Sequence, residues 1–122
     1  MGPGEIASER AEPGVTLITF SGEHDLNTAP DLREELQTAI ADGIPIVVDL
    51  SGAAFIDSSI LGAVLDARRQ AEERKLGFAV ALSDGAQPVE RVLEVTGLSS
   101  TLPVHPTRAA AIKAAQASPS TE

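Results

Sequence analysis

Short aliphatic runs alternate with amphipathic helical patterns along the chain, and this alternation constrains the fold more than any other feature. Residues 44–50 and 77–82 are almost entirely apolar, which is typical of strands covered on both faces in a parallel sheet. Between these runs, apolar residues recur at helical spacing and predict a helix from about Ser58 to Lys75. Such an order requires a sheet with helices packed on it.

The remaining elements follow from strand-forming runs, capping residues and glycine stops. β-Branched and apolar residues predict a strand at 15–20, and Thr28 with Pro30 predicts the start of a helix that Gly43 ends. We interpret residues 51–56 as a connection. The other predicted elements are a helix between Pro88 and Gly97, a strand at 102–104 and a helix at 107–117.

Strand and helix therefore follow each other four times. This order predicts an α/β fold, with a mixed, mostly parallel sheet of four to five strands and four helices packed on it. The 122 residues suffice for one domain of common size. We expect that domain at residues 14–117, a flexible tail or edge strand at 1–13, and a disordered tail at 118–122.

Composition excludes several classes of function. The 18 acidic and 9 basic side chains give a net charge of −9, which argues against nucleic acid or an anionic membrane surface as partner. With no Cys and only two His, the chain lacks the residues for thiol chemistry or a multi-His metal site, and we expect neither a metal nor a cofactor. No apolar run approaches the roughly 18 residues of a membrane span, and the N-terminus does not resemble a signal peptide. We therefore expect the protein in the cytoplasm.

The negative charge is unevenly distributed. Residues 1–61 hold eleven acidic and two basic side chains, whereas acids and bases balance in residues 62–122. One face of the molecule is thus expected to be strongly acidic, and a solubilising surface is the simplest interpretation.

Two segments are candidate sites, because α/β sheets place their sites at the carboxyl ends of parallel strands. They are residues 21–27 and residues 55–62. In the second, Asp57, Ser58 and Ser59 stand where the connection becomes a helix. Asp and Ser are preferred N-caps, so capping alone would explain them. A hydroxyl at a helix N-terminus also suits a phosphate, because unpaired N–H groups and the helix dipole stabilise the added charge. Both interpretations can hold together.

Catalysis has weaker support in the sequence. A nucleophilic Ser58 or Ser59 would need a base, and only His24 or His105 could serve if the fold brought one of them within reach. The chain has neither a Gly-x-Ser-x-Gly elbow nor a glycine-rich phosphate loop. We interpret His24 as an exposed loop residue, with a pH sensor as the alternative.

Three segments together resemble STAS domains, and within that group the bacterial anti-sigma factor antagonists. They are Ser-Gly-Glu-His-Asp-Leu-Asn-Thr-Ala-Pro-Asp-Leu at 21–32, Val-Val-Asp-Leu-Ser at 47–51 and Phe-Ile-Asp-Ser-Ser at 55–59. The Gly-Glu-x-Asp motif alone is weak, but its combination with the other two at this separation is specific. The resemblance covers roughly residues 12–116 and implies a sheet with helices on it, in agreement with the predicted order.

The resemblance implies a phosphorylation switch. In that family, an anti-sigma factor that is itself a protein kinase phosphorylates the first Ser after the Asp, which is Ser58 here. The unphosphorylated antagonist binds the anti-sigma factor, which then releases its sigma factor. We accordingly expect no enzymatic activity, no direct contact with nucleic acid or membrane, and a monomer in the absence of the partner. The expected phosphosite neighbours are Asp25, Asp57 and Ser59, and the expected partner-binding residues are Asp25, Asn27, Thr28, Ile60 and Leu61.

Residue 60 departs from the family pattern, in which Gly often follows the Ser pair. If Ser58 caps the helix, Ile60 lies in the first turn, about 100° around the axis from Leu61. Ile60 could flank the core beside Val64, but we expect an exposed side chain that contacts the anti-sigma factor.

The same resemblance also allows a second function. The chain could serve as a STAS subunit of another assembly, such as a lipid-transport system or a stress-signalling complex. A pull-down separates the two, because a histidine-kinase-like ATPase partner supports the antagonist and transporter subunits support the alternative.

Overall fold

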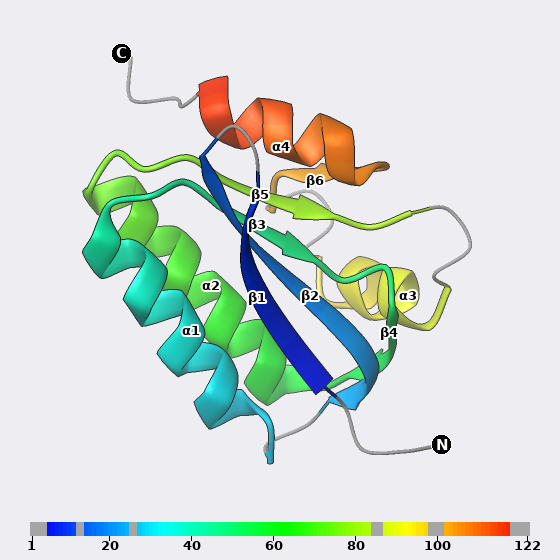
Figure 1. Cartoon of the computed structure of the whole chain (residues 1–122). Coiled ribbons are helices and arrows are strands. Elements are labelled where there is room, and N and C mark those ends of the chain that lie inside the picture. The colour runs from blue at the N-terminus through cyan, green and yellow to red at the C-terminus, as the bar shows by residue number, and fades with distance from the viewer. Residues whose placement is uncertain (1–4, 12–13, 25–26, 84–86, 98–101, 118–122) are drawn as a thin grey trace.

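The computed structural model describes residues 5–11, 14–24, 27–83, 87–97 and 102–117, whose arrangement is shown in Figure 1. The described strands are β1 (Glu5–Ala11), β2 (Val15–His24), β3 (Ile46–Asp49), β4 (Ala53–Ile56), β5 (Phe78–Ala81) and β6 (Val104–His105). The described helices are α1 (Ala29–Asp42), α2 (Ser58–Glu73), α3 (Gln87–Val95) and α4 (Arg108–Ala117). The predicted α/β class is confirmed, but the described residues form a sheet of six strands instead of the four to five expected. Within the described segments, no helix combines the length and the apolar character needed to cross a membrane.

The sheet is mixed and mostly parallel, as predicted. Its strands follow the order β1-β2-β3-β5-β6, and β4 lies beside the C-terminal end of β2. β1 runs antiparallel to β2, and the other described pairs are parallel. Parallel strands require crossovers, and the helices that form them, α1, α2 and α3, pack on one face of the sheet, whereas α4, which follows the last strand, covers the other (Figure 1).

Alternate residues of the central strands pack on opposite faces of the sheet. Leu17 and Val47 pack in a cluster with Ala111 of α4. Their neighbours Ile18 and Val48 belong to the larger cluster, to which α1, α2 and α3 contribute. Both sides of these strands are therefore buried, which explains why their sequences read as continuous aliphatic runs.

The segment 51–56, which we expected to be a connection, contains the strand β4. This strand pairs in parallel with the end of β2, so that His24 stands opposite Ile56. The turn before it lies close to β2, because a Cβ on Gly52 would collide with the carbonyl oxygen of Phe20. Sequence analysis missed this strand because its two middle residues are exposed and its two end residues are buried. Buried and exposed residues therefore do not alternate along it.

The N-terminal segment forms an edge strand at Glu5–Ala11, which was one of the two alternatives for residues 1–13. Its Ile6 packs partly buried against the larger core cluster. β2 continues to His24, so this residue ends a strand instead of lying in a loop. The predicted tail at 118–122 lies outside the described residues.

The prediction that Ile60 is exposed is wrong. Its side chain is fully buried, as is that of Val64, and Leu61 is buried as well. The helix is capped by Asp57 rather than Ser58, so Ile60 is its third residue. Because they are four residues apart, Ile60 and Val64 lie about 40° apart around the axis whichever residue caps the helix, and both meet the core. Ile60 and Leu61 are core residues and leave the set of expected partner contacts.

We expect Ile60→Ala to lower the free energy of unfolding by about 2–5 kcal/mol, because the truncation leaves a cavity in the core. Chemical denaturation measures this change. Val95→Ala is the matched control, since Val95 is 79% exposed, and it should alter the free energy by no more than about 0.5 kcal/mol. Equally small changes in both variants would contradict the burial of Ile60.

Candidate functional site

The candidate site is built around the first turn of α2, where Asp57 caps the helix. One carboxylate oxygen of Asp57, Oδ1, accepts hydrogen bonds from the backbone N–H groups of Ser59 at 2.9 Å and Ile60 at 3.2 Å. The same oxygen accepts the hydroxyl proton of Ser59 at 2.6 Å. Capping by this motif, expected from the sequence, is confirmed, and Asp57 is the residue that performs it.

The two serines of the motif differ in their surroundings. Ser59 is half-buried, and its hydroxyl is held by the Asp57 carboxylate. Ser58 is exposed, and among the described residues none forms a hydrogen bond with its hydroxyl. The hydroxyl of Ser58 is therefore the one that an external reactant can reach.

Sheet pairing brings the two sequence motifs together. The parallel pairing of β2 with β4 ends with His24 opposite Ile56, so the segments that follow both strands leave the sheet at one edge. Asn27 is exposed and Thr28 half-buried at the start of α1. α1 and α2 begin at this same end of the molecule (Figure 1). Asp25, the other expected neighbour of the phosphosite, lies outside the described residues.

Thr28 occupies the N-cap position of α1, but its side chain makes no capping hydrogen bond to the helix. The sequence therefore predicts the start of this helix correctly, although the mechanism is not the expected one. The Pro in the first turn favours the start without a side-chain cap, because its fixed φ is already helical. Gly43 ends the helix with a φ of 71°, as predicted.

A polar seam fixes α1 beside α2. The Arg33 guanidinium donates to Asp66 at 2.8 Å, and the Gln37 amide donates to Gln70 at 2.9 Å. The hydrogen bond from Arg33 holds the pKa of the Asp66 carboxyl below its usual value, and the nearby charge of Arg69 adds to this. These pairs join residues 33 positions apart, a separation at which the sequence carries no local signal.

The motif Asp-Leu-Ser at the end of β3 has a structural role. Asp49 is buried, and its Oδ2 accepts a hydrogen bond at 2.9 Å from Nε of Arg108, at the start of α4. The Nη2 of the same guanidinium lies 2.9 Å from this oxygen, which makes the contact an ion pair. Its Oδ1 accepts the backbone N–H of Ser51 at 2.9 Å. The hydroxyl oxygen of Ser51 accepts the backbone N–H of Ser83 at 2.9 Å. The motif therefore ties α4 and the end of β5 to the centre of the sheet.

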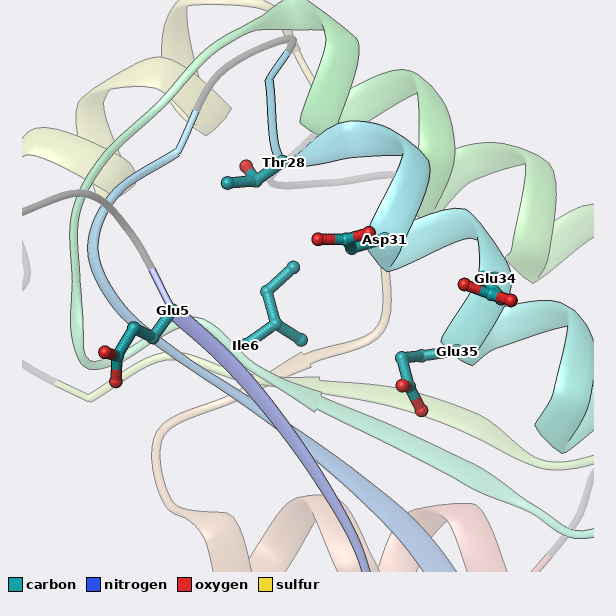
Figure 2. Close-up of a pocket in the computed structure, with 6 residues that line it drawn as sticks. All are labelled: Glu5, Ile6, Thr28, Asp31, Glu34 and Glu35. Carbon is teal, nitrogen blue, oxygen red and sulfur yellow. The ribbon is translucent and has the colours of Figure 1, made fainter.

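A cavity of about 350 Å³ lies between α1 and the start of β1, in the acidic N-terminal half of the chain. Figure 2 shows its lining, with Ile6 between the strand and the helix and carboxylates around it. The lining residues are Glu5, Ile6, Thr28, Asp31, Glu34 and Glu35. Four of the six are acidic, so the cavity is negatively charged. The described residues contain no group of three or more His, Cys, Asp or Glu that could hold a metal ion.

Comparison with known proteins places these features in context. The family model for the STAS domain matches residues 8–111. An anti-sigma F factor antagonist of Paenibacillus polymyxa is 32% identical over 94 residues, which cover 75% of this chain and 79% of that protein.

Solved structures agree with this match. The crystal structure of an anti-sigma factor antagonist from Mycobacterium paratuberculosis superposes with a TM-score of 0.75 at 31% identity, covering 93% of this chain and 95% of that one. The Bacillus cell fate determinant SpoIIAA in its phosphorylated form gives a TM-score of 0.67 at 25% identity, covering 89% and 97% of the two chains.

We expect Asp57→Ala to lower the free energy of unfolding by about 0.5–2 kcal/mol, because Ser59 and Ile60 lose the acceptor of their backbone N–H groups. Asp57→Asn is the matched control and should lose less, since Asn is also a good N-cap. Denaturation curves measure both variants. An unchanged stability in Asp57→Ala would contradict the capping role.

Proposed function

The chain belongs to the STAS-domain family of anti-sigma factor antagonists, and from this premise we propose that Ser58 is the phosphorylated residue of a binding switch. In this proposal the unphosphorylated protein binds an anti-sigma factor that has serine-kinase activity, and the sigma factor is released. Phosphorylation of Ser58 ends the binding. Anti-sigma factor antagonists are non-enzymatic regulators, so the chemistry belongs to the partner.

The contrast between Ser58 and Ser59 is the observation that carries this proposal. A kinase needs a hydroxyl that it can approach and deprotonate. The hydroxyl of the half-buried Ser59 is held by Asp57 as part of the cap, whereas Ser58 is exposed at the first residue of α2. A phosphate on Ser58 would also lie at the positive end of a 16-residue helix, where the dipole favours negative charge.

The direction of the switch follows from the local charges. A phosphate adds about −1.5 to −2 charges beside Asp57. The two cations of residues 1–61 have acidic partners, since Arg10 lies 4.0 Å from Asp42 and Arg33 lies 2.8 Å from Asp66. The added charge therefore has no spare cation in that half of the chain to neutralise it, and it faces the partner.

The size of this effect is large enough for a switch. Two unit charges 4 Å apart interact by about 4 kcal/mol at an effective dielectric constant of 20. If an acidic group of the anti-sigma factor faces Ser58, phosphorylation would therefore weaken the binding of the two proteins by more than a factor of ten, before screening by salt.

We expect each cognate anti-sigma factor kinase, supplied with ATP, to add one phosphoryl group, and we expect that group on Ser58. Fragment mass spectrometry locates it. Ser59→Ala is the matched control and should still be phosphorylated, whereas Ser58→Ala should not. A phosphate found on Ser59 or Thr28 would contradict the assignment.

We also expect phosphorylated protein to bind the anti-sigma factor at least tenfold more weakly than unphosphorylated protein, because its added charge is not neutralised. Isothermal calorimetry of both forms measures the ratio, which should shrink as salt concentration rises. Ser58→Ala should keep the affinity of the unphosphorylated form. Equal or tighter binding by the phosphorylated form would contradict the proposed direction, and binding only to transporter subunits would favour the alternative assembly.

A further inference from the structure

One large apolar side chain is exposed directly beside the proposed switch. Phe55 is 45% exposed, and within the described segments the only other large hydrophobic residue exposed to this degree is Val95, at the end of α3. Aromatic side chains carry much apolar area, so a Phe residue that is nearly half exposed leaves apolar surface available for a contact. Phe55 therefore needs an explanation that its own fold does not supply.

Anchoring of β4 does not provide that explanation. The strand is already held by Ala53 and Ile56, which are both buried, and by its pairing with β2. α3 packs against β4 and yet leaves Phe55 partly uncovered. The exposed part of the ring adds nothing to the core.

The position of Phe55 brings it within reach of a partner that contacts Ser58. Only Ile56 and Asp57 separate the two residues, and three residues of extended chain span no more than about 11 Å. A partner of ordinary interface size that contacts Ser58 also covers that distance. Phe55 lies on the strand that leads into the capped helix, so both side chains have a fixed place relative to each other.

We propose that Phe55 is the apolar anchor by which the unphosphorylated protein binds its anti-sigma factor, inserted into an apolar pocket next to that partner's phosphate-donor site; this rests on the function proposed above. Aromatic anchors dominate the binding energy of many protein interfaces. In an acidic half of the molecule, such a contact supplies affinity that depends on neither charge nor salt. Phe55 then provides the affinity, and Ser58 provides the switching.

The experiment uses the full chain and the purified anti-sigma factor kinases of its own organism, tested one at a time. We expect Phe55→Ala to weaken binding of the unphosphorylated protein at least tenfold and to raise KM for phosphorylation of Ser58, with kcat little changed. The ratio of the wild-type affinity to that of Phe55→Ala should be the same at low and at high salt. Phe55→Leu should keep most of the affinity, and Val95→Ala, the matched exposed apolar control, should keep all of it.

A second measurement does not depend on the stability of any variant. The ring resonances of Phe55 in the wild-type protein should shift or broaden when the anti-sigma factor is added. Ring signals that stay unchanged at saturation, or equal affinities of Phe55→Ala and wild type, would overturn the anchor while the switch at Ser58 stands. A wild-type chain that neither binds nor is phosphorylated by any of these kinases would instead contradict the proposed function.

Discussion

The Asp57 carboxylate fixes the start of α2, and the arrangement of the candidate site depends on this one interaction. A single oxygen receives two backbone N–H groups and one hydroxyl, and these bonds set the rotation of the helix. Ser58 and Ile60 lie about 200° apart around the axis, so the rotation that buries Ile60 turns Ser58 towards solvent. Ser59 becomes part of the cap. The same contact thus decides which serine hydroxyl is accessible.

The remaining contacts hold this first turn in place relative to the sheet. The parallel pairing of β4 with β2 delivers Asp57 to the carboxyl edge, and the pairs of Arg33 with Asp66 and Gln37 with Gln70 keep α1 beside α2. On the other face, Arg108 joins α4 to the buried carboxylate of Asp49. A surface that recognises a partner by charge and shape requires such rigid support, because binding then costs little ordering of the site.

The parts of this architecture that the sequence predicts are those with a local physical signal. The aliphatic runs of β3 and β5 are recognisable because both faces of these strands are buried, and α1 ends where Gly43 adopts its positive φ. β4 was missed because burial at its two ends gives no alternation. The exposure of Ile60 was mispredicted, although its spacing of four residues from Val64 already placed it beside the apolar stripe of the helix. The partner of Asp49 lies 59 residues away, a distance over which residue patterns carry no information.

Ile60, which departs from the motif that the sequence resembles, packs inside the core. A Gly in the first turn of a helix contributes no side chain to packing, whereas Ile60 fills space beside the buried Val64. Its burial removes it from any surface that a partner meets, so the departure from the family pattern alters neither the charge nor the accessible shape next to Ser58. Position 60 therefore acts on the stability of α2, while recognition is left to the side chains that this helix and β4 expose.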